Sequence, residues 1–345
     1  MALVLLCKNI FKSVHFYGIL LIFVFIDNVC LQSSEDDVEK ARASISSLKE
    51  VTGNPVDINE VQFFLHTTGP KGYITRNIDT FKPNVIREKD SKIYFLIHGW
   101  TQSRETTPWF KPLTEFLLDK NPDAYVIQTD WSKPANVNYS LSAFYTESVG
   151  NIIGDFIHII VKDNSIPLKN IVLISHSLGA HVSGWAGKRH YELTHVKLPR
   201  IIALDPAGPL FSKRPDKMRL NKNDADVVMV IHTNGNGFGI ATPSGTIDFF
   251  PNGGQHQQGC ATNITKKRSY NADRSIWCDH TRAYKLFLEA VKNPKMFMAE
   301  KCKSYEHFEQ LKCGRTKVSL GDMKTTKKGL FYLNTSGIPP FYSYR

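Results

Sequence analysis

The 345-residue sequence lacks the features that mark several classes of protein. It has only six cysteines and no C-x2-C pair, which argues against a disulfide-dense scaffold and a zinc ribbon. It has no aspartate cluster resembling a calcium-binding loop, so we expect no metal ion. Hydrophobic residues make up 42% and charged residues 22%, which excludes disorder, collagen and coiled coil as the main architecture.

Acidic residues are outnumbered, since 43 lysines and arginines face 32 aspartates and glutamates, for a net charge of +11. Such a balance suits nucleic acid or an anionic membrane surface as a partner. The sequence has neither a basic helix nor an aromatic platform, so nucleic-acid binding is not expected.

A long apolar run is also missing. The run Phe16–Ile26 has eleven residues, against the roughly 20 that a membrane-spanning helix needs. Lys8 and Lys12 precede it and a polar stretch follows, as in a secretory signal peptide, with a short signal anchor as the alternative. We therefore predict a signal peptide at residues 1–32 and one secreted, extracellular domain at 33–345.

Removal of such a signal peptide would lower the net charge from +11 to +10 and remove Cys7 and Cys30. The four cysteines that remain allow three pairings. Sequential pairing is favoured because each bond then closes a short loop, namely Cys260–Cys278 and Cys302–Cys313. Three glycosylation sequons, at Asn138, Asn263 and Asn334, are compatible with secretion.

Short apolar runs alternate with segments of helical spacing, which predicts an α/β fold with a mostly parallel sheet and helices on both faces. The segment 233–259 is rich in glycine, asparagine and proline, and is interpreted as a long loop region. Strands are expected at 93–97, 124–127, 171–174, 201–204 and 227–231, and helices at 109–118, 143–161, 178–188 and 284–291.

The segment Ser175-His-Ser-Leu-Gly179 lies between an expected strand and an expected helix. Ser177 is then placed as in a nucleophile elbow, a sharp turn that exposes a serine hydroxyl. Ser175 stands where the G-x-S-x-G pattern has glycine, which predicts a more crowded elbow. An ordinary Ser/Gly-rich turn is the alternative interpretation.

A serine nucleophile needs a base and an orienting acid, in the chain order serine, acid, histidine for this kind of fold. Asp205 is the first carboxylate at a strand end after Ser177, and prolines stiffen its loop. A turn or helix-capping role is the alternative, and Asp226 and Asp248 are rivals. Asp226 starts a strand, which places it at the wrong edge of the sheet.

Among twelve histidines, His280 is the candidate base, because it follows a cysteine of a predicted disulfide and precedes an expected helix. The histidines in or beside strand ends are interpreted as structural or supporting groups, namely His98, His176, His181 and His232. An oxyanion hole needs backbone N–H donors, and Leu178 and Trp100 are the candidates.

The set of motifs resembles the pancreatic-lipase-like family, from about Val61 to Tyr332. The resemblance implies an α/β-hydrolase fold, carboxylic ester hydrolysis without a cofactor, the triad Ser177, Asp205 and His280, and oxyanion donors at Trp100 and Leu178. The matching motifs are His98-Gly-Trp100, Asp130-Trp131, His176-Ser-Leu-Gly-Ala-His181, Leu204-Asp-Pro-Ala-Gly-Pro209, Val230-Ile-His-Thr233, Asp248-Phe-Phe-Pro-Asn-Gly-Gly254 and Cys278-Asp-His-Thr-Arg282.

Against the family pattern, we expect no C-terminal β-sandwich domain and therefore no colipase partner. Only seventeen residues, 261–277, separate Cys260 from Cys278, so the predicted lid is short. In this the chain is similar to phospholipase A1 members, including those of insects. A triacylglycerol or galactolipid lipase is the alternative, and a non-catalytic, yolk-type lipid-binding protein a more remote one.

The predicted lid is basic, and aromatic residues are interleaved with the charges. This composition suits contact with a phospholipid or lipid-droplet surface. A solvated loop is the alternative. The interface residues that we predict are Lys266, Lys267, Arg268 and Trp277.

Overall fold

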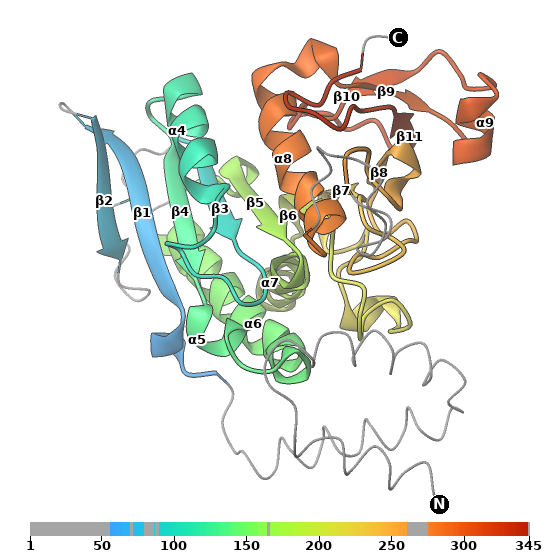
Figure 1. Ribbon diagram of the computed structural model, residues 1–345. Coiled ribbons are helices and arrows are strands. Elements are labelled where there is room, and N and C mark those ends of the chain that lie inside the picture. Colours follow the sequence, from blue (N-terminus) through green and yellow to red (C-terminus); the bar gives the residue numbers. More distant parts are fainter. Residues whose placement is uncertain are drawn as a thin grey trace, which may run out of the picture. The chain divides into compact units, whose positions relative to one another are not determined.

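A twisted sheet of eleven strands forms the centre of the structure, which is a computed structural model (Figure 1). The structure describes residues 56–69, 72–78, 86, 90–163, 166–260 and 275–343. The predicted signal peptide, Asn263 and the three lid cations Lys266, Lys267 and Arg268 lie outside these residues. No helix in the described ranges is long and apolar enough to cross a membrane.

The middle of the sheet is parallel, in the order β4-β3-β5-β6-β7-β8-β11. These strands are buried on both faces, which explains their nearly continuous apolar sequences. Antiparallel strands complete the two edges, β1 and β2 on one side and β9 and β10 on the other. The strands are β1 (Gln62–Gly69), β2 (Gly72–Ile78), β3 (Ile93–Ile97), β4 (Tyr125–Asp130), β5 (Ile171–His176), β6 (Leu198–Leu204), β7 (Ala225–Ile231), β8 (Ile247–Pro251), β9 (Met298–Lys301), β10 (Lys317–Ser319) and β11 (Gly329–Leu333).

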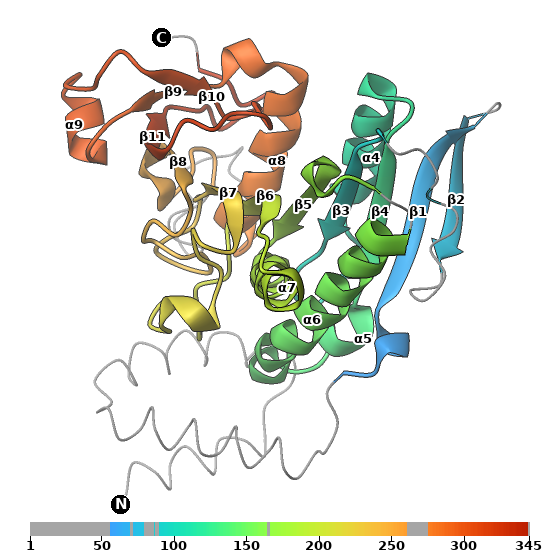
Figure 2. The same ribbon diagram turned by 180° about the vertical axis from the view of Figure 1, so that it is seen from behind.

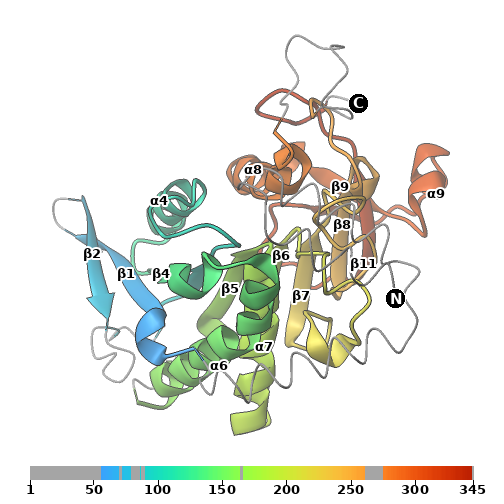
Figure 3. The same ribbon diagram turned by 60° about the horizontal axis from the view of Figure 1, so that its bottom comes forward.

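Helices cover both faces of the sheet, as Figures 2 and 3 show. One apolar cluster packs α6 and α7 against the sheet, and a second packs α4 and α8 against the other face. This arrangement is the α/β-hydrolase fold that the sequence predicts. The α-helices are α4 (Phe110–Lys120), α5 (Ser132–Ala135), α6 (Tyr139–Asp163), α7 (Leu178–Thr194), α8 (Cys278–Lys292) and α9 (Tyr305–Glu309), and the 3-10 turns are η1 (Ile58–Glu60), η2 (Leu168–Asn170), η3 (Asp216–Met218), η4 (Asn252–Gly254) and η5 (Pro294–Met296).

The interpretation of residues 233–259 as a loop region was wrong in part, because it contains β8. This strand is fully buried although Asp248 lies within it, since His232 and two backbone N–H groups satisfy that carboxylate. The expected helix at 284–291 begins earlier, at Cys278, so His280 lies in its first turn rather than before it. The hairpin of β1 and β2 was not anticipated from the residues.

The structure contains the two sequential disulfides, Cys260–Cys278 and Cys302–Cys313. The first joins the start of α8 to the segment that follows β8 and η4. The second lies in a small separate cluster beside Phe308 and Tyr332. Only the first is therefore adjacent to the predicted base.

Candidate functional site

Ser177 occupies a sharp turn between β5 and α7, with φ 58° and ψ −124°. A positive φ is uncommon for a residue other than glycine and marks a constrained backbone. The turn needs small neighbours. A Cβ atom at Gly179 would lie 2.4 Å from the carbonyl oxygen of His98, and one at Gly99 would lie 2.9 Å from the Cβ of Ser177. The local geometry is therefore that of the predicted elbow, with Ser175 in place.

The three predicted triad residues meet at the carboxyl ends of the parallel strands. Ser177 Oγ lies 2.8 Å from His280 Nε2, and His280 Nδ1 lies 2.6 Å from Asp205 Oδ2. All three side chains are buried, with Asp205 fully enclosed. The carboxylate accepts a hydrogen bond from Nδ1–H, which leaves Nε2 without a proton and able to take the hydroxyl proton of the serine.

Two backbone N–H groups fix the second oxygen of the Asp205 carboxylate. Thr233 donates to Asp205 Oδ1 at 2.7 Å, and Asn234 donates to the same atom at 3.1 Å. Hydrogen bonds of this kind stabilise the ionised carboxylate in a buried place. Sequence reasoning missed these donors, because a backbone N–H leaves no mark on residue type.

Neither rival acid reaches His280 in the structure. Asp226 is an exposed residue near the start of β7. Asp248 is buried, but its Oδ1 lies 2.8 Å from Nε2 of His232. His232 Nδ1 in turn donates to the carbonyl of Ile240 at 2.8 Å. This bond joins the two ends of the loop that contains Thr233 and Asn234.

The other strand-end histidines make structural hydrogen bonds. His176 Nε2 donates to the carbonyl of His280 at 3.2 Å, and burial together with His280 holds the pKa of His176 well below its usual value. His98 accepts from the N–H of Trp131 at 3.1 Å. His181 accepts from the N–H of Leu220 at 3.1 Å and donates to Ala207.

The two predicted oxyanion donors belong to segments next to the serine, since Leu178 follows Ser177 directly and Gly99, beside Trp100, packs against Ser177. Leu178 is the first residue of α7, so its N–H has no acceptor within the helix. The amides flanking Trp100 are both occupied, since Gly99 donates to Gln102 Oε1 and Thr101 to the carbonyl of Ala135. These two hydrogen bonds hold the backbone on both sides of the Trp100 amide.

Aromatic rings surround the base. Trp277 stacks on Phe238 with ring centroids 4.3 Å apart, and the Phe238 ring lies 5.9 Å from that of His280. Trp277 also meets the edge of Trp100 at 6.5 Å. Of the four predicted interface residues, Trp277 alone is described, and it lies beside the triad.

Two sequons fall in the described residues. Asn138 is exposed, and Asn334 is half-buried. No group of three histidine, cysteine, aspartate or glutamate side chains within the described ranges is arranged to hold a metal ion.

Residues 26–341 match the model of the family described as Lipase. The chain therefore belongs to this family, the pancreatic-lipase-like family that its motifs predict. It is similar to the lipoprotein lipase of Rattus norvegicus, at 34% identity over 270 residues, which is 73% of this chain and 56% of that protein. The lipoprotein lipase of Bos taurus is 31% identical over 339 residues, which is 91% of this chain and 69% of that protein.

The chain spans little more than half the length of most of the lipoprotein lipases that it matches, 56% for the rat protein. Among solved structures, esterase PE8 is similar with a TM-score of 0.31 and 16% identity, covering 42% of this chain and 69% of that one.

Proposed function

We propose that this protein hydrolyses carboxylic esters of lipids through a covalent acyl-enzyme. The observation that supports this most directly is the continuous hydrogen-bonded line from Ser177 Oγ through His280 to Asp205, with distances of 2.8 and 2.6 Å. Membership of the lipase family supports the same chemistry.

In the proposed reaction, His280 Nε2 takes the proton of Ser177 as the serine oxygen attacks the ester carbonyl. Asp205 stabilises the imidazolium that forms and keeps the ring in one orientation. The backbone N–H groups of Trp100 and Leu178 receive the negative charge of the tetrahedral oxygen. His280 then protonates the departing alcohol. In the second half of the reaction, His280 takes a proton from a water molecule that attacks the acyl-enzyme. It then returns a proton to Ser177 Oγ as the fatty acid leaves.

For the substrate, we propose phospholipids cleaved at the sn-1 ester, as in a phospholipase A1. The seventeen-residue length of the segment between Cys260 and Cys278 supports this, because a short lid is expected to admit a bulky headgroup. Triacylglycerol is the second candidate, and the relatives named lipoprotein lipase favour it. The further proposed partner is a phospholipid or lipid-droplet surface, without a colipase.

We propose that the protein acts outside the cell. Its two disulfides support this, because such bonds persist in oxidising compartments.

The test measures fatty-acid release from phosphatidylcholine and from triolein, for the wild type and for Ser177→Ala. We expect release from phosphatidylcholine, and a loss of about a thousandfold or more in the variant, because alanine has no hydroxyl to form the acyl-enzyme beside His280. Release from triolein alone would contradict the phospholipase assignment. Full activity of Ser177→Ala would contradict the nucleophile assignment.

A further inference from the structure

A second route of hydrogen bonds joins Asp205 to His280, apart from their direct contact. It starts at the N–H of Thr233, which donates to Asp205 Oδ1 at 2.7 Å. The carbonyl of the same Thr233 accepts from the side chain of Gln257 at 3.1 Å. The backbone N–H of Gln257 donates to Asp279 Oδ1 at 2.6 Å, and Asp279 directly precedes His280. The two routes together close a ring.

Gln257 is the central member of this ring. Its side chain is fully buried, and both its amide nitrogen and its amide oxygen are bonded. Nε2 donates to the carbonyls of Thr233 and Pro251, at 3.1 and 3.0 Å, and Oε1 accepts from Asn252 at 3.0 Å. A buried amide with this set of partners holds one orientation, because any rotation would leave polar groups unpaired.

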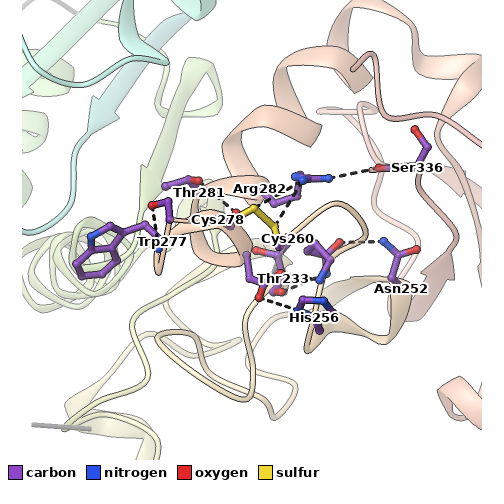
Figure 4. Close-up of a disulfide and its surroundings, with 12 residues drawn as sticks. Thr233, Asn252, His256, Cys260, Trp277, Cys278, Thr281, Arg282 and Ser336 are labelled. Carbon is purple, nitrogen blue, oxygen red and sulfur yellow. Dashed lines mark hydrogen bonds and ion pairs between the residues drawn. A yellow bond between two sulfur atoms is a disulfide. The ribbon is translucent and has the colours of Figure 1, made fainter. Parts of the chain in front are cut away.

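Asp279 completes the link to the helix that holds the base. It lies in the first turn of α8, where the N–H groups of the helix favour a negative charge. Besides the bond from Gln257, its Oδ2 lies 2.9 Å from His256 Nδ1. Figure 4 shows Thr233, His256 and Asn252 gathered beside the disulfide Cys260–Cys278.

The ring has a consequence for the acid and the base because they come from different elements. Asp205 follows β6, and His280 belongs to α8. Their separation is set by the chain segments that support them, and a shift of about 1 Å can reduce a rate about a hundredfold. Each supporting segment here is bonded to Gln257.

We propose that Gln257 and Asp279 are positioning residues, which hold the carboxylate of Asp205 and the imidazole of His280 at their working distance. The proposal rests on the proposed ester hydrolysis at the same site. The hydrogen bonds described above join neither residue to Ser177, and both act through the loop of Thr233 and the first turn of α8.

The first experiment replaces Gln257 by methionine, which keeps the volume and removes the amide. The matched control is Gln128→Met, because Gln128 on β4 is also buried and its side chain donates to Thr114 at 2.9 Å. For both variants, kcat and KM for an ester are measured well below the unfolding temperature. The rate of labelling of Ser177 by a fluorophosphonate is measured alongside.

We expect Gln257→Met to lower kcat and the labelling rate by about ten- to a hundredfold, with KM within about twofold. Gln128→Met should leave all three unchanged. Equal behaviour of the two variants would overturn the proposal. The labelling rate needs no lipid substrate. Wild-type labelling without lipid hydrolysis would therefore overturn the proposed function alone. The labelling rates of Gln257→Met and Gln128→Met would still test the positioning role.

Two variants of Asp279 test the positioning role even if Gln257→Met does not fold. Asp279→Asn keeps an oxygen that can accept from the N–H of Gln257, whereas Asp279→Ala removes it. We expect near-wild-type kcat for the asparagine and a loss of about tenfold or more for the alanine. The same kcat for both variants would overturn the role of Asp279.

Discussion

Ser175 lies in the strand two residues before the nucleophile, aligned with Ile97 on β3 and Ala203 on β6. Its hydroxyl is buried and has no hydrogen-bond partner among the described residues. A buried hydroxyl without a partner loses its hydration and regains nothing. The elbow nevertheless keeps its geometry, so the cost of this serine falls on stability rather than on the site.

Ser175→Ala should therefore raise the free energy of unfolding by about 1 kcal/mol, with ester hydrolysis unchanged. Denaturant unfolding measures the first, and a soluble ester substrate the second. Ser142→Ala is the control, because the buried hydroxyl of Ser142 donates to the carbonyl of Pro134 at 2.8 Å. That variant should lose stability, and an equal loss in Ser175→Ala would contradict the interpretation.

Sequence reasoning located the triad because each member follows a feature that can be recognised in the sequence. Ser177 and Asp205 each follow a buried strand, and His280 follows a cysteine. It could not find the donors to Asp205 or the role of Gln257. Backbone amides have no residue type, and a glutamine in a Gly- and Asn-rich segment has the same pattern as a solvated one.

At the scale of elements, α8 is held to the rest of the site at its first turn. The disulfide Cys260–Cys278 fixes the first residue of the helix. Arg282, one turn later, is buried and lies over the ring of Phe341 at 4.4 Å, and it donates to the carbonyl of Ser336 at 3.3 Å. The end of the chain therefore supports the helix that holds the base.

The two disulfides should differ in their effect on activity. Replacing either pair by alanine should lower the free energy of unfolding by about 2–4 kcal/mol. Only the loss of Cys260–Cys278 should also lower kcat, by about tenfold, because it frees the start of α8 beside His280. Steady-state kinetics on the two double variants would test this, and an equal kcat in both would contradict it.

The elements themselves were predictable to different degrees. The strands β3, β5, β6 and β7 are apolar runs with clear limits, and their positions agree with expectation to within a few residues. β8 was hidden because its aspartate and the surrounding glycines resemble a loop. Its burial depends on His232, sixteen residues earlier, which no local pattern can show.

At the scale of the molecule, several histidines are buried in the folded chain. Burial lowers the pKa of His181 to about 3, and burial together with Arg104 lowers that of His66 to about 4. An unfolded histidine has a pKa near 6.5. Between these values the unfolded chain binds more protons than the folded one, so the free energy of unfolding falls as the pH falls.

We therefore expect stability to decline steadily from about pH 6.5 towards pH 4, by about 1.4 kcal/mol per pH unit for each such histidine. His181→Gln should lower this slope by about one proton, because glutamine does not titrate. Urea unfolding at several pH values would measure the slope. An unchanged slope in the variant would show that His181 is already charged in the folded state.

The order of the triad along the chain has a consequence for synthesis. Ser177 and His280 are 103 positions apart, and Asp205 and His280 are 75 apart. A nascent chain on the ribosome therefore exposes its nucleophile and its acid long before its base. Until α8 has emerged and docked, Ser177 has no base to take its proton, and the growing polypeptide lacks the proposed ester-hydrolysing site.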